Sequence, residues 1–253
     1  MNNLSLKKLQ FENDEVHIWL VEVDNLLEKF STFHKYLSID EKKRANRFCF
    51  EKDQKNYIIS HGALRSLISF YLEIHPKKLK FTHGKYGKPE VTDNLSGEKL
   101  YFNMSHSNGL ALYVVARDRE VGIDIEYIRD IPEMAQIVER FFSNTEKKVF
   151  HTLPESWKKQ FFFQIWVRKE SILKGIGAGL HQPLEKFDVL LETDEIPEPV
   201  AGNLKKMPQW HIEDLNPSTA YAAAYAIKGL SRLRWYRYRN TETDNKRDHT
   251  EGY

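Results

Sequence analysis

The chain of 253 residues contains one cysteine, Cys49, and no long apolar run. A single cysteine excludes a disulfide within the chain and any zinc site built mainly from cysteine. No stretch approaches the roughly 20 apolar residues that cross a membrane, and the opening residues, MNNLSLKKLQ, lack the apolar segment of a signal peptide. These absences predict a cytoplasmic protein with no membrane partner.

Several well-known catalytic motifs are missing as well. The ten histidines never form H-E-x-x-H, and no G-K-[ST] follows a glycine-rich loop. The segment GIGAGL follows a predicted helix and not a strand, which disfavours a dinucleotide fold. Ser105 and His106 are adjacent in an extended segment without a G-x-S-x-G elbow, so their side chains should point to opposite faces. A serine hydrolase is therefore disfavoured.

A pair of acids stands out in what is present. Residues 110–116 and 120–126 are predicted strands joined by a charged turn, and Asp124 and Glu126 alternate with apolar residues in the second. Side chains two apart on a strand share a face, so the two carboxylates should point the same way. Hard carboxylate oxygens suit Mg²⁺ together with phosphate oxygens. The simpler alternative is a solvated acidic face.

A second informative stretch is the predicted helix over 158–174. Its apolar stripe includes Trp166, and Glu170 and Lys174 follow at intervals of one turn, so both should lie on one side of the helix. The two could form a surface ion pair, or they could place an acid and a cation at a cleft. Lys169 should point about 100° away from Glu170, which favours a structural or rim position.

Several cations could bind an anion near these acids. Ser38 is a predicted N-cap of a basic helix that carries Arg44, and a Gly/Pro turn at 84–89 presents Lys88. We interpret the acids and cations together as Mg²⁺ on Asp124, Glu126 and Glu170, with a polyphosphate held by the following residues: Arg44, Lys88, His106 and Lys174. A non-catalytic nucleic-acid-binding protein is the alternative, based on the basic helix and the basic, aromatic segment 232–239.

The order of elements indicates an α+β protein made of two similar halves with a cleft between them. Each half has a long predicted helix, a turn leading to a strand, and a serine-containing turn that opens an alternating strand. We divide the chain into 1–125, 126–240 and a polar tail, 241–253, which we expect to be disordered. Helices are predicted at 26–37, 52–72, 131–142 and 158–174, with further helices after Ser38 and Ser143. Strands are predicted at 16–23, 110–116, 120–126, 187–191, 209–213, 217–227 and 232–239.

The chain resembles a known family. G-I-D-I-E at 122–126, followed about 40 residues later by W-x-x-K-E-S-x-x-K at 166–174, is similar to the signature of the Sfp-type 4′-phosphopantetheinyl transferases. Three further segments support the resemblance: Y-G-K-P at 86–89, F-N-x-S-H-S at 102–107 and G-x-G-L-x-x-P-L-x-x-F at 177–187. Together they cover most of the chain, from about Ser38 to Ala226.

The resemblance implies a pseudo-twofold monomer that binds coenzyme A between its halves and transfers 4′-phosphopantetheine to a serine of an apo acyl or peptidyl carrier protein, releasing 3′,5′-ADP. By the same match, Asp124, Glu126 and Glu170 would hold Mg²⁺, and Lys174 would contact the phosphates. Lys88, Ser105 and His106 would bind the nucleotide end, with Arg44 where the family often has lysine. Glu170 is the candidate to take the serine proton.

The resemblance leaves the carrier open among fatty-acid, polyketide, nonribosomal-peptide and lysine-biosynthesis systems. Family carriers tend to be acidic around their serine, so the basic face near Arg44 and the aromatic run at 161–163 are candidate docking surfaces.

Overall fold

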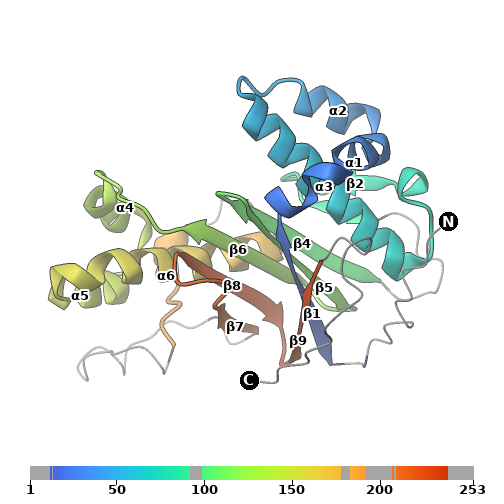
Figure 1. The fold of residues 1–253 in the computed structure, drawn as a ribbon. Helices are drawn as coiled ribbons and strands as arrows, with labels where there is room; N and C mark the ends of the chain where they lie inside the picture. The colour runs from blue at the N-terminus through green and yellow to red at the C-terminus, as the bar shows by residue number, and fades with distance from the viewer. Residues whose placement is uncertain are drawn as a thin grey trace, which may run out of the picture.

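Two β-sheets packed face to face form the centre of the molecule (Figure 1). The computed structural model describes residues 12, 14–91, 99–177, 183–191, 207 and 209–238. Each sheet carries a 22-residue helix on its outer face: α3 (Glu51–Leu72) on the first and α6 (Glu155–Ile176) on the second. Within the described residues the fold is thus layered, with helices outside and sheets inside, which confirms the α+β prediction.

The first sheet has the strand order β4-β5-β1-β9. Its strands are β1 (Glu15–Glu22), β4 (Leu100–Ser107), β5 (Leu110–Arg117) and β9 (Arg232–Arg237). The second sheet has the order β6-β8-β7, with β6 (Val121–Tyr127), β7 (Trp210–Leu215) and β8 (Tyr221–Lys228). A small hairpin joins β2 (Phe81–His83) to β3 (Pro89–Val91).

The two sheets repeat one topology. In each half a first strand is followed by the long helix and then by two antiparallel strands, and the last of these pairs antiparallel with the first strand. β1, α3, β4 and β5 therefore correspond to β6, α6, β7 and β8. Strand β9 is an addition that pairs in parallel with β1 at the edge of the first sheet, as predicted for an edge strand.

Shorter helices complete the structure. They are η1 (Asp24–Lys29), α1 (Phe30–Tyr36), α2 (Ile39–Ala45), η2 (Pro76–Lys78), α4 (Met134–Phe141), α5 (Asn144–Thr152) and η4 (Leu184–Lys186). Ser38 and Ser143 both cap their helices through full capping boxes. Each serine Oγ accepts from the backbone N–H of the glutamate three residues on, and each serine backbone N–H donates to the carboxylate of that glutamate. The predicted helix starts at both serines are confirmed.

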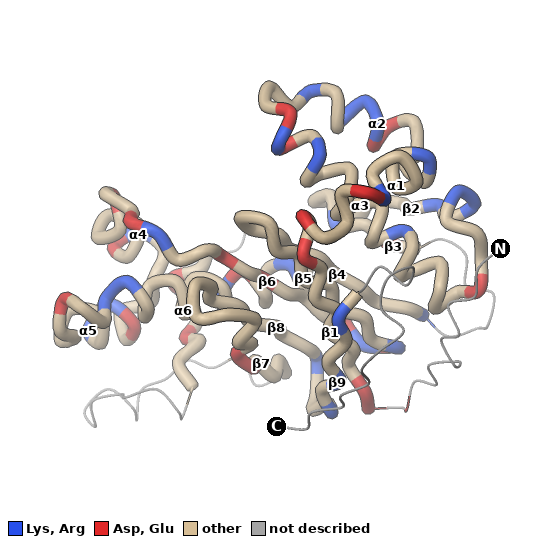
Figure 2. Tube along the Cα trace, in the orientation of Figure 1, with Lys and Arg blue, Asp and Glu red and all other residues tan. Residues whose placement is uncertain are grey.

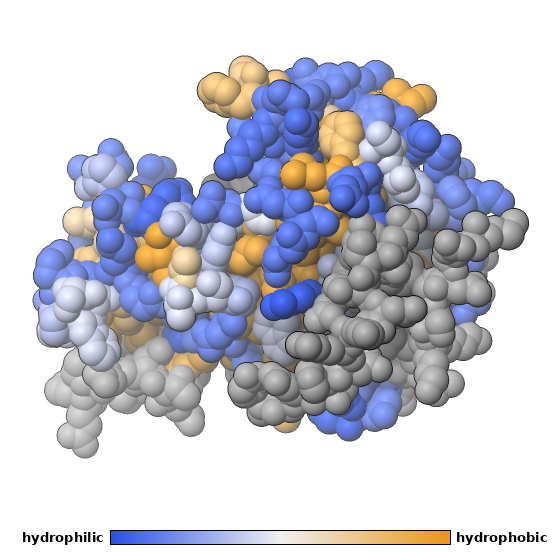
Figure 3. Space-filling model, in the orientation of Figure 1, coloured by the Kyte–Doolittle hydropathy of each residue, from blue (hydrophilic) through white to orange (hydrophobic). Residues whose placement is uncertain are grey.

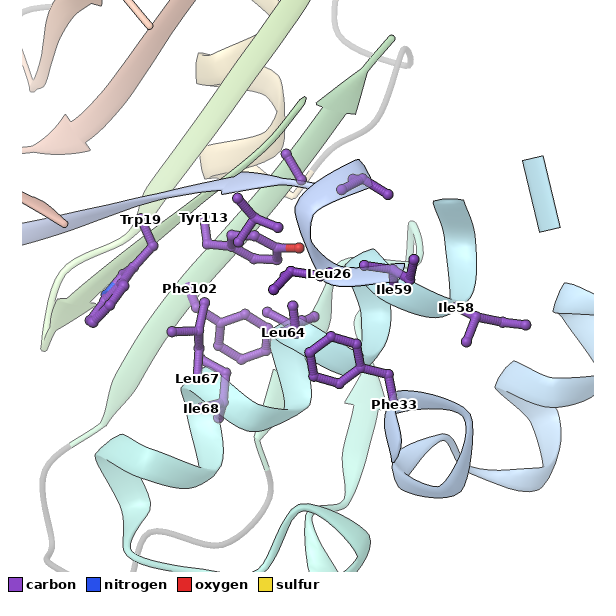
Figure 4. Packing of buried hydrophobic residues seen from close by; sticks show 14 of the residues in the cluster. Trp19, Leu26, Phe33, Ile58, Ile59, Leu64, Leu67, Ile68, Phe102 and Tyr113 are labelled. Carbon is purple, nitrogen blue, oxygen red and sulfur yellow. The ribbon is translucent and has the colours of Figure 1, made fainter. Parts of the chain in front are cut away.

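The strand pattern explains the layers. In β1, Ile18 faces the second sheet, whereas Trp19 faces α3, where it joins Phe33, Leu64 and Tyr113 in a core between helix and sheet (Figure 4). β5 and β8 alternate in the same way, and apolar residues on both faces identify them as central strands. Burial of this apolar surface is the main stabilising contribution to the fold.

Two sequence predictions fail in the second half. Residues 187–191 form no strand, because side chains satisfy this backbone instead: Lys169 donates to the Phe187 carbonyl, Arg168 to the Val189 carbonyl, and the Val189 N–H donates to Glu146. The aromatic run 161–163 is no docking surface, since Phe162 and Phe163 are buried in the core beneath α6.

The boundary placed at 125/126 lies inside β6, which belongs to the second sheet as a whole. We therefore propose that the two halves divide in the turn at 118–120, and that β9, which pairs with β1, belongs to the first half. The polar tail 241–253 lies outside the described residues. Among the helices that the structure describes, none is both long and apolar enough to span a membrane.

Candidate active site

The site lies where the two halves meet. Strands β4 and β6 run beside each other at this seam, and side chains of β4 reach β6: Asn103 Oδ1 accepts from the Ile123 N–H, and Ser107 Oγ accepts from the Tyr127 N–H. A pocket of about 410 Å³ opens here. Its lining comes from α3, β4, β6 and α6: His61, Met104, Ser105, His106, Asp124, Glu126, Trp166, Glu170 and Lys174.

Asp124 is the most buried acid of the pocket, with 3% of its surface exposed. Its Oδ1 accepts hydrogen bonds from Ser105 Oγ at 2.7 Å and from Lys174 Nζ at 2.6 Å, and Lys174 also donates to Ser105 Oγ at 2.9 Å. Its Oδ2 is buried and has no hydrogen-bond partner among the described residues. A buried carboxylate oxygen without a partner is costly, so this oxygen is suited to an incoming cation or donor.

The other two acids flank Asp124. Glu126 shares its face of β6 and accepts from Ser107 Oγ at 3.0 Å. Glu170 reaches the pocket from α6 and makes no hydrogen bond or ion pair with the described residues. Burial, followed by the charge of Asp124, raises the pKa of Glu170 to about 7. The structure thus brings the three predicted acids to one pocket.

Lys174 pairs across the fold and not along its own helix. The surface ion pair with Glu170, one of the two alternatives from sequence, is replaced by an ion pair with Asp124 on β6. The sequence predicts opposite faces for Ser105 and His106, yet both line the pocket. The Ser105 hydroxyl donates to Asp124, and its oxygen accepts from Lys174. This arrangement makes a polar cradle with both signs of charge and gives no serine–histidine pair.

The approach of β6 to α6 depends on two glycines. A Cβ added to Gly122 would lie 2.1 Å from the Ser171 carbonyl oxygen and 2.3 Å from the Gly175 nitrogen, so only glycine permits the two backbones to approach this closely. Gly175 in turn faces the Trp210 ring, which a Cβ would meet at 2.6 Å. This tight crossing sets the distance between Asp124 and Lys174.

The donor set fits a hard divalent cation chemically. All three acids supply oxygen, and the partnerless Asp124 Oδ2 belongs to a residue that lines the pocket. No group of three His, Cys, Asp or Glu side chains in the described part of the chain is arranged closely enough to hold a metal ion as it stands. A metal would therefore draw these carboxylates together.

Comparisons with known proteins decide the family. The family model "4′-phosphopantetheinyl transferase superfamily" matches residues 120–226, and the model "4′-phosphopantetheinyl transferase, N-terminal" matches residues 24–118. The 4′-phosphopantetheinyl transferase HetI of Nostoc sp. is 35% identical over 218 residues, which is 86% of this chain and 90% of that protein. This chain belongs to the 4′-phosphopantetheinyl transferase superfamily.

Other relatives agree with this assignment to the superfamily. The 4′-phosphopantetheinyl transferase Sfp of Bacillus subtilis is 30% identical over 66% of this chain and 72% of that protein. The human L-aminoadipate-semialdehyde dehydrogenase-phosphopantetheinyl transferase is 29% identical over 59% of this chain and 51% of its own length. A solved structure, the holo-[acyl-carrier-protein] synthase of Thermotoga maritima, matches with a TM-score of 0.33 and 18% identity over 45% of this chain and 64% of its own, too little to add to the argument.

Two residues that the superfamily resemblance placed at the nucleotide lie outside the pocket lining. Lys88 Nζ donates to the carbonyls of Val121 at 3.0 Å and Gly175 at 2.7 Å, beside the tight crossing of β6 and α6, and burial lowers the pKa of Lys88 to about 8. Arg44 is exposed on α2, with its guanidinium 5.9 Å from the centre of the Tyr57 ring.

Sequence reasoning missed one polar residue of this transferase pocket. His61 lines it from α3, stacks on Tyr57 with ring centres 3.7 Å apart, and places Nδ1 3.0 Å from the Tyr57 carbonyl. The sequence signal that could have identified His61 is a histidine among the apolar positions of a long predicted helix. Lys169, expected to be structural or at the rim, is structural: it is fully buried, 2.9 Å from Glu146, and donates to two carbonyls near η4.

Proposed function

We propose that this protein transfers the 4′-phosphopantetheine group of coenzyme A to a serine hydroxyl of an apo carrier protein, releasing 3′,5′-ADP. The observation that carries the proposal is the convergence of Asp124, Glu170, Ser105 and Lys174 in one pocket between the halves of a chain of this superfamily. Such a pocket offers separate partners for a metal ion and for phosphate oxygens, which a phosphoryl transfer needs.

The acids have a proposed role as metal ligands. Asp124, Glu126 and Glu170 would hold Mg²⁺, and the orphaned Oδ2 of Asp124 supports this assignment. A Mg²⁺ ion bound there would supply neutralisation of charge on the pyrophosphate.

The cations have a proposed role toward the phosphates. Lys174 would exchange part of its contact with Asp124 for a phosphate oxygen, since both are anionic oxygen acceptors. Ser105 and His106 would bind the nucleotide end, and Arg44 would reach it from α2. Because Lys88 already donates to two carbonyls, we propose that it holds the crossing of β6 and α6 together beside the nucleotide.

The proposed chemical step is a displacement at the β-phosphorus of coenzyme A. The serine oxygen of the carrier attacks the β-phosphorus of coenzyme A, the bond from that phosphorus to the bridging oxygen breaks, and 3′,5′-ADP leaves with that oxygen. The serine proton passes to Glu170, directly or through water. Glu170 is suited to this role because it faces the pocket and has no hydrogen-bond partner among the described residues.

The nucleic-acid alternative loses much of its support. Of the basic residues in β9, Arg232 pairs with Asp14, Arg234 with Glu15, and Arg237 lies 3.9 Å from Glu22. These guanidinium groups hold β9 against β1 and its preceding residues, so they are neutralised and not directed at a polyanion.

The experiment that tests the proposal is intact mass spectrometry of an apo carrier protein after incubation with this protein, coenzyme A and Mg²⁺. We expect a gain of about 340 Da, the mass of a phosphopantetheine group, and its loss when EDTA is present. No gain across fatty-acid, polyketide, nonribosomal-peptide and lysine-biosynthesis carriers would contradict the proposed activity. A gain that persists in EDTA would contradict the metal assignment alone.

A further inference from the structure

The turn between α2 and α3 presents aromatic side chains to solvent. Phe48 is 41% exposed and Phe50 is 72% exposed, and Cys49 between them is exposed as well. Figure 3 shows apolar side chains standing out at the end of the molecule that carries α2 and the start of α3. Exposed apolar side chains that lie together within a polar rim are typical of interaction surfaces. We name residues 47–50 the aromatic turn.

Of the cations on and around the aromatic turn, some form ion pairs within their helices and three form none with a described residue. Lys43 pairs with Asp40 and Lys55 pairs with Glu51, each within its own helix. By contrast, no ion pair with a described residue involves Lys42, Arg47 or Lys52, which lie along α2, in the turn and at the start of α3: the basic stretch is visible as blue segments in Figure 2. The surface thus combines exposed apolar rings with an excess of cations over acids, three of these cations lying outside any ion pair with a described residue.

The aromatic turn is connected to the pocket by neighbouring rings. Phe48 lies 5.4 Å from Tyr57, measured between ring centres, and Tyr57 stacks on His61, which lines the pocket. A macromolecule that sends one side chain into the pocket from this side would therefore lie against the turn. Carrier proteins are such macromolecules, so a docking role for this turn rests on the proposed transferase function.

We propose that the aromatic turn docks the carrier protein, through a segment that combines acidic side chains with an apolar patch next to the modified serine. Charge complementarity favours an acidic partner, and the exposed rings favour a partner with apolar side chains to cover them. A nucleic acid fits less well, because four carboxylates are interleaved with six cations between residues 40 and 55, and Glu51 and Asp53 stand exposed beside the rings.

The test uses two surface variants. Phe50→Ser removes the most exposed ring, and because Phe50 occupies the N-cap of α3 without a side-chain cap bond, serine there suits the helix start. Arg47→Glu reverses the charge of one of the three cations outside any ion pair with a described residue. The matched controls are Leu230→Ser, an apolar residue that is 80% exposed on the turn before β9, and Lys78→Glu, an exposed lysine in η2 beyond the far end of α3.

Binding is read by fluorescence anisotropy with a labelled apo carrier whose serine is replaced by alanine, so that no transfer occurs. We expect Kd to rise about tenfold for the variant that combines Phe50→Ser with Arg47→Glu, and to stay within about twofold for the combined controls. In the transfer assay the KM for the carrier should rise by a similar factor, whereas kcat and the KM for coenzyme A should stay within about twofold.

Unchanged carrier Kd and KM in the combined variant would overturn the docking inference. So would a loss of salt-sensitive binding to a single-stranded RNA probe with the carrier KM unaffected, since the turn would then belong to a nucleic acid. Failure of the wild-type protein to transfer contradicts the proposed function, and the anisotropy measurement still decides whether the turn binds a carrier.

Discussion

Gly122→Ala is the substitution for which the structure makes the sharpest prediction. The added methyl carbon would lie 2.1 Å from the Ser171 carbonyl oxygen, 2.3 Å from the Gly175 nitrogen and 2.9 Å from the Gly175 Cα. All three contacts are with helix backbone, which cannot rotate away as a side chain can. Helix α6 would have to move by about 1 Å or more to restore van der Waals distance.

This displacement has two measurable consequences. Overpacking in a rigid interior costs about 1 to 3 kcal/mol, and we expect the upper end because the obstruction is main chain on both elements. For a chain of this size, about 3 kcal/mol corresponds to a fall in Tm of roughly 6 to 12 °C, measured by calorimetry or circular dichroism. Transfer should also fall more than the folded fraction does, because Lys174 would leave its 2.6 Å contact with Asp124.

Gly84→Ala is the matched control. A Cβ at Gly84 would meet nothing closer than a Glu90 carboxylate oxygen at 3.6 Å, at the end of a flexible side chain, and Gly84 does not have a positive φ. We expect its Tm to stay within about 2 °C of wild type. A Gly122→Ala protein that melts together with the wild type and transfers normally would refute the view that backbone contact sets this crossing.

Three further predictions follow from the same contacts. Asp124→Ala or Glu170→Ala should abolish transfer while the far-ultraviolet spectrum and cooperative melting persist, and near-normal transfer by either variant would remove it from the metal site. Lys88→Met should lower the free energy of unfolding by about 1 to 3 kcal/mol, because two carbonyls lose their donor; a KM for coenzyme A raised tenfold at unchanged stability would instead restore Lys88 as a phosphate contact. Burial lowers the pKa of His61 from 6.5 to about 4. As pH falls below 6.5, the His61 imidazole therefore takes up a proton in the unfolded chain before it does so in the folded one, so the stability that His61 contributes is complete above pH 6.5 and is lost as pH falls toward 4. In denaturant titrations, His61→Leu should remove about 1 to 3 kcal/mol of this loss of stability in acid. Identical pH profiles of unfolding free energy for the variant and the wild type would contradict this prediction.

Which acids and cations of the site share a face could be predicted, because this depends on the residue spacing along one strand and one helix. Asp124 and Glu126 share a face through the two-residue repeat of a strand, and Glu170 and Lys174 share a side through the helical turn. Strand β6 and helix α6 formed as predicted, so all four side chains reach the pocket.

Predictions based on local sequence alone failed where a distant group decided the outcome. Residues 187–191 look like a strand, yet Lys169 and Glu146 occupy their backbone hydrogen-bonding groups, and no local pattern reveals partners about 20 to 40 residues away. Lys88 sits in a turn typical of an exposed cation, but its ammonium donates to carbonyls of β6 and α6; its proposed place at the nucleotide stays a prediction.

The amino-acid order was sufficient for most of the elements, their amphipathic faces, the duplicated order of strands and helices, and the family motifs, because these depend on residues close together in the chain. Folding in three dimensions settled that Lys174 would pair with Asp124, that Gly122 and Gly175 would allow β6 and α6 to touch, and that His61 would join the pocket. Close packing joins atoms through space, so the partner of a buried charge, or the neighbour of a missing Cβ, depends on which element the fold brings next to it.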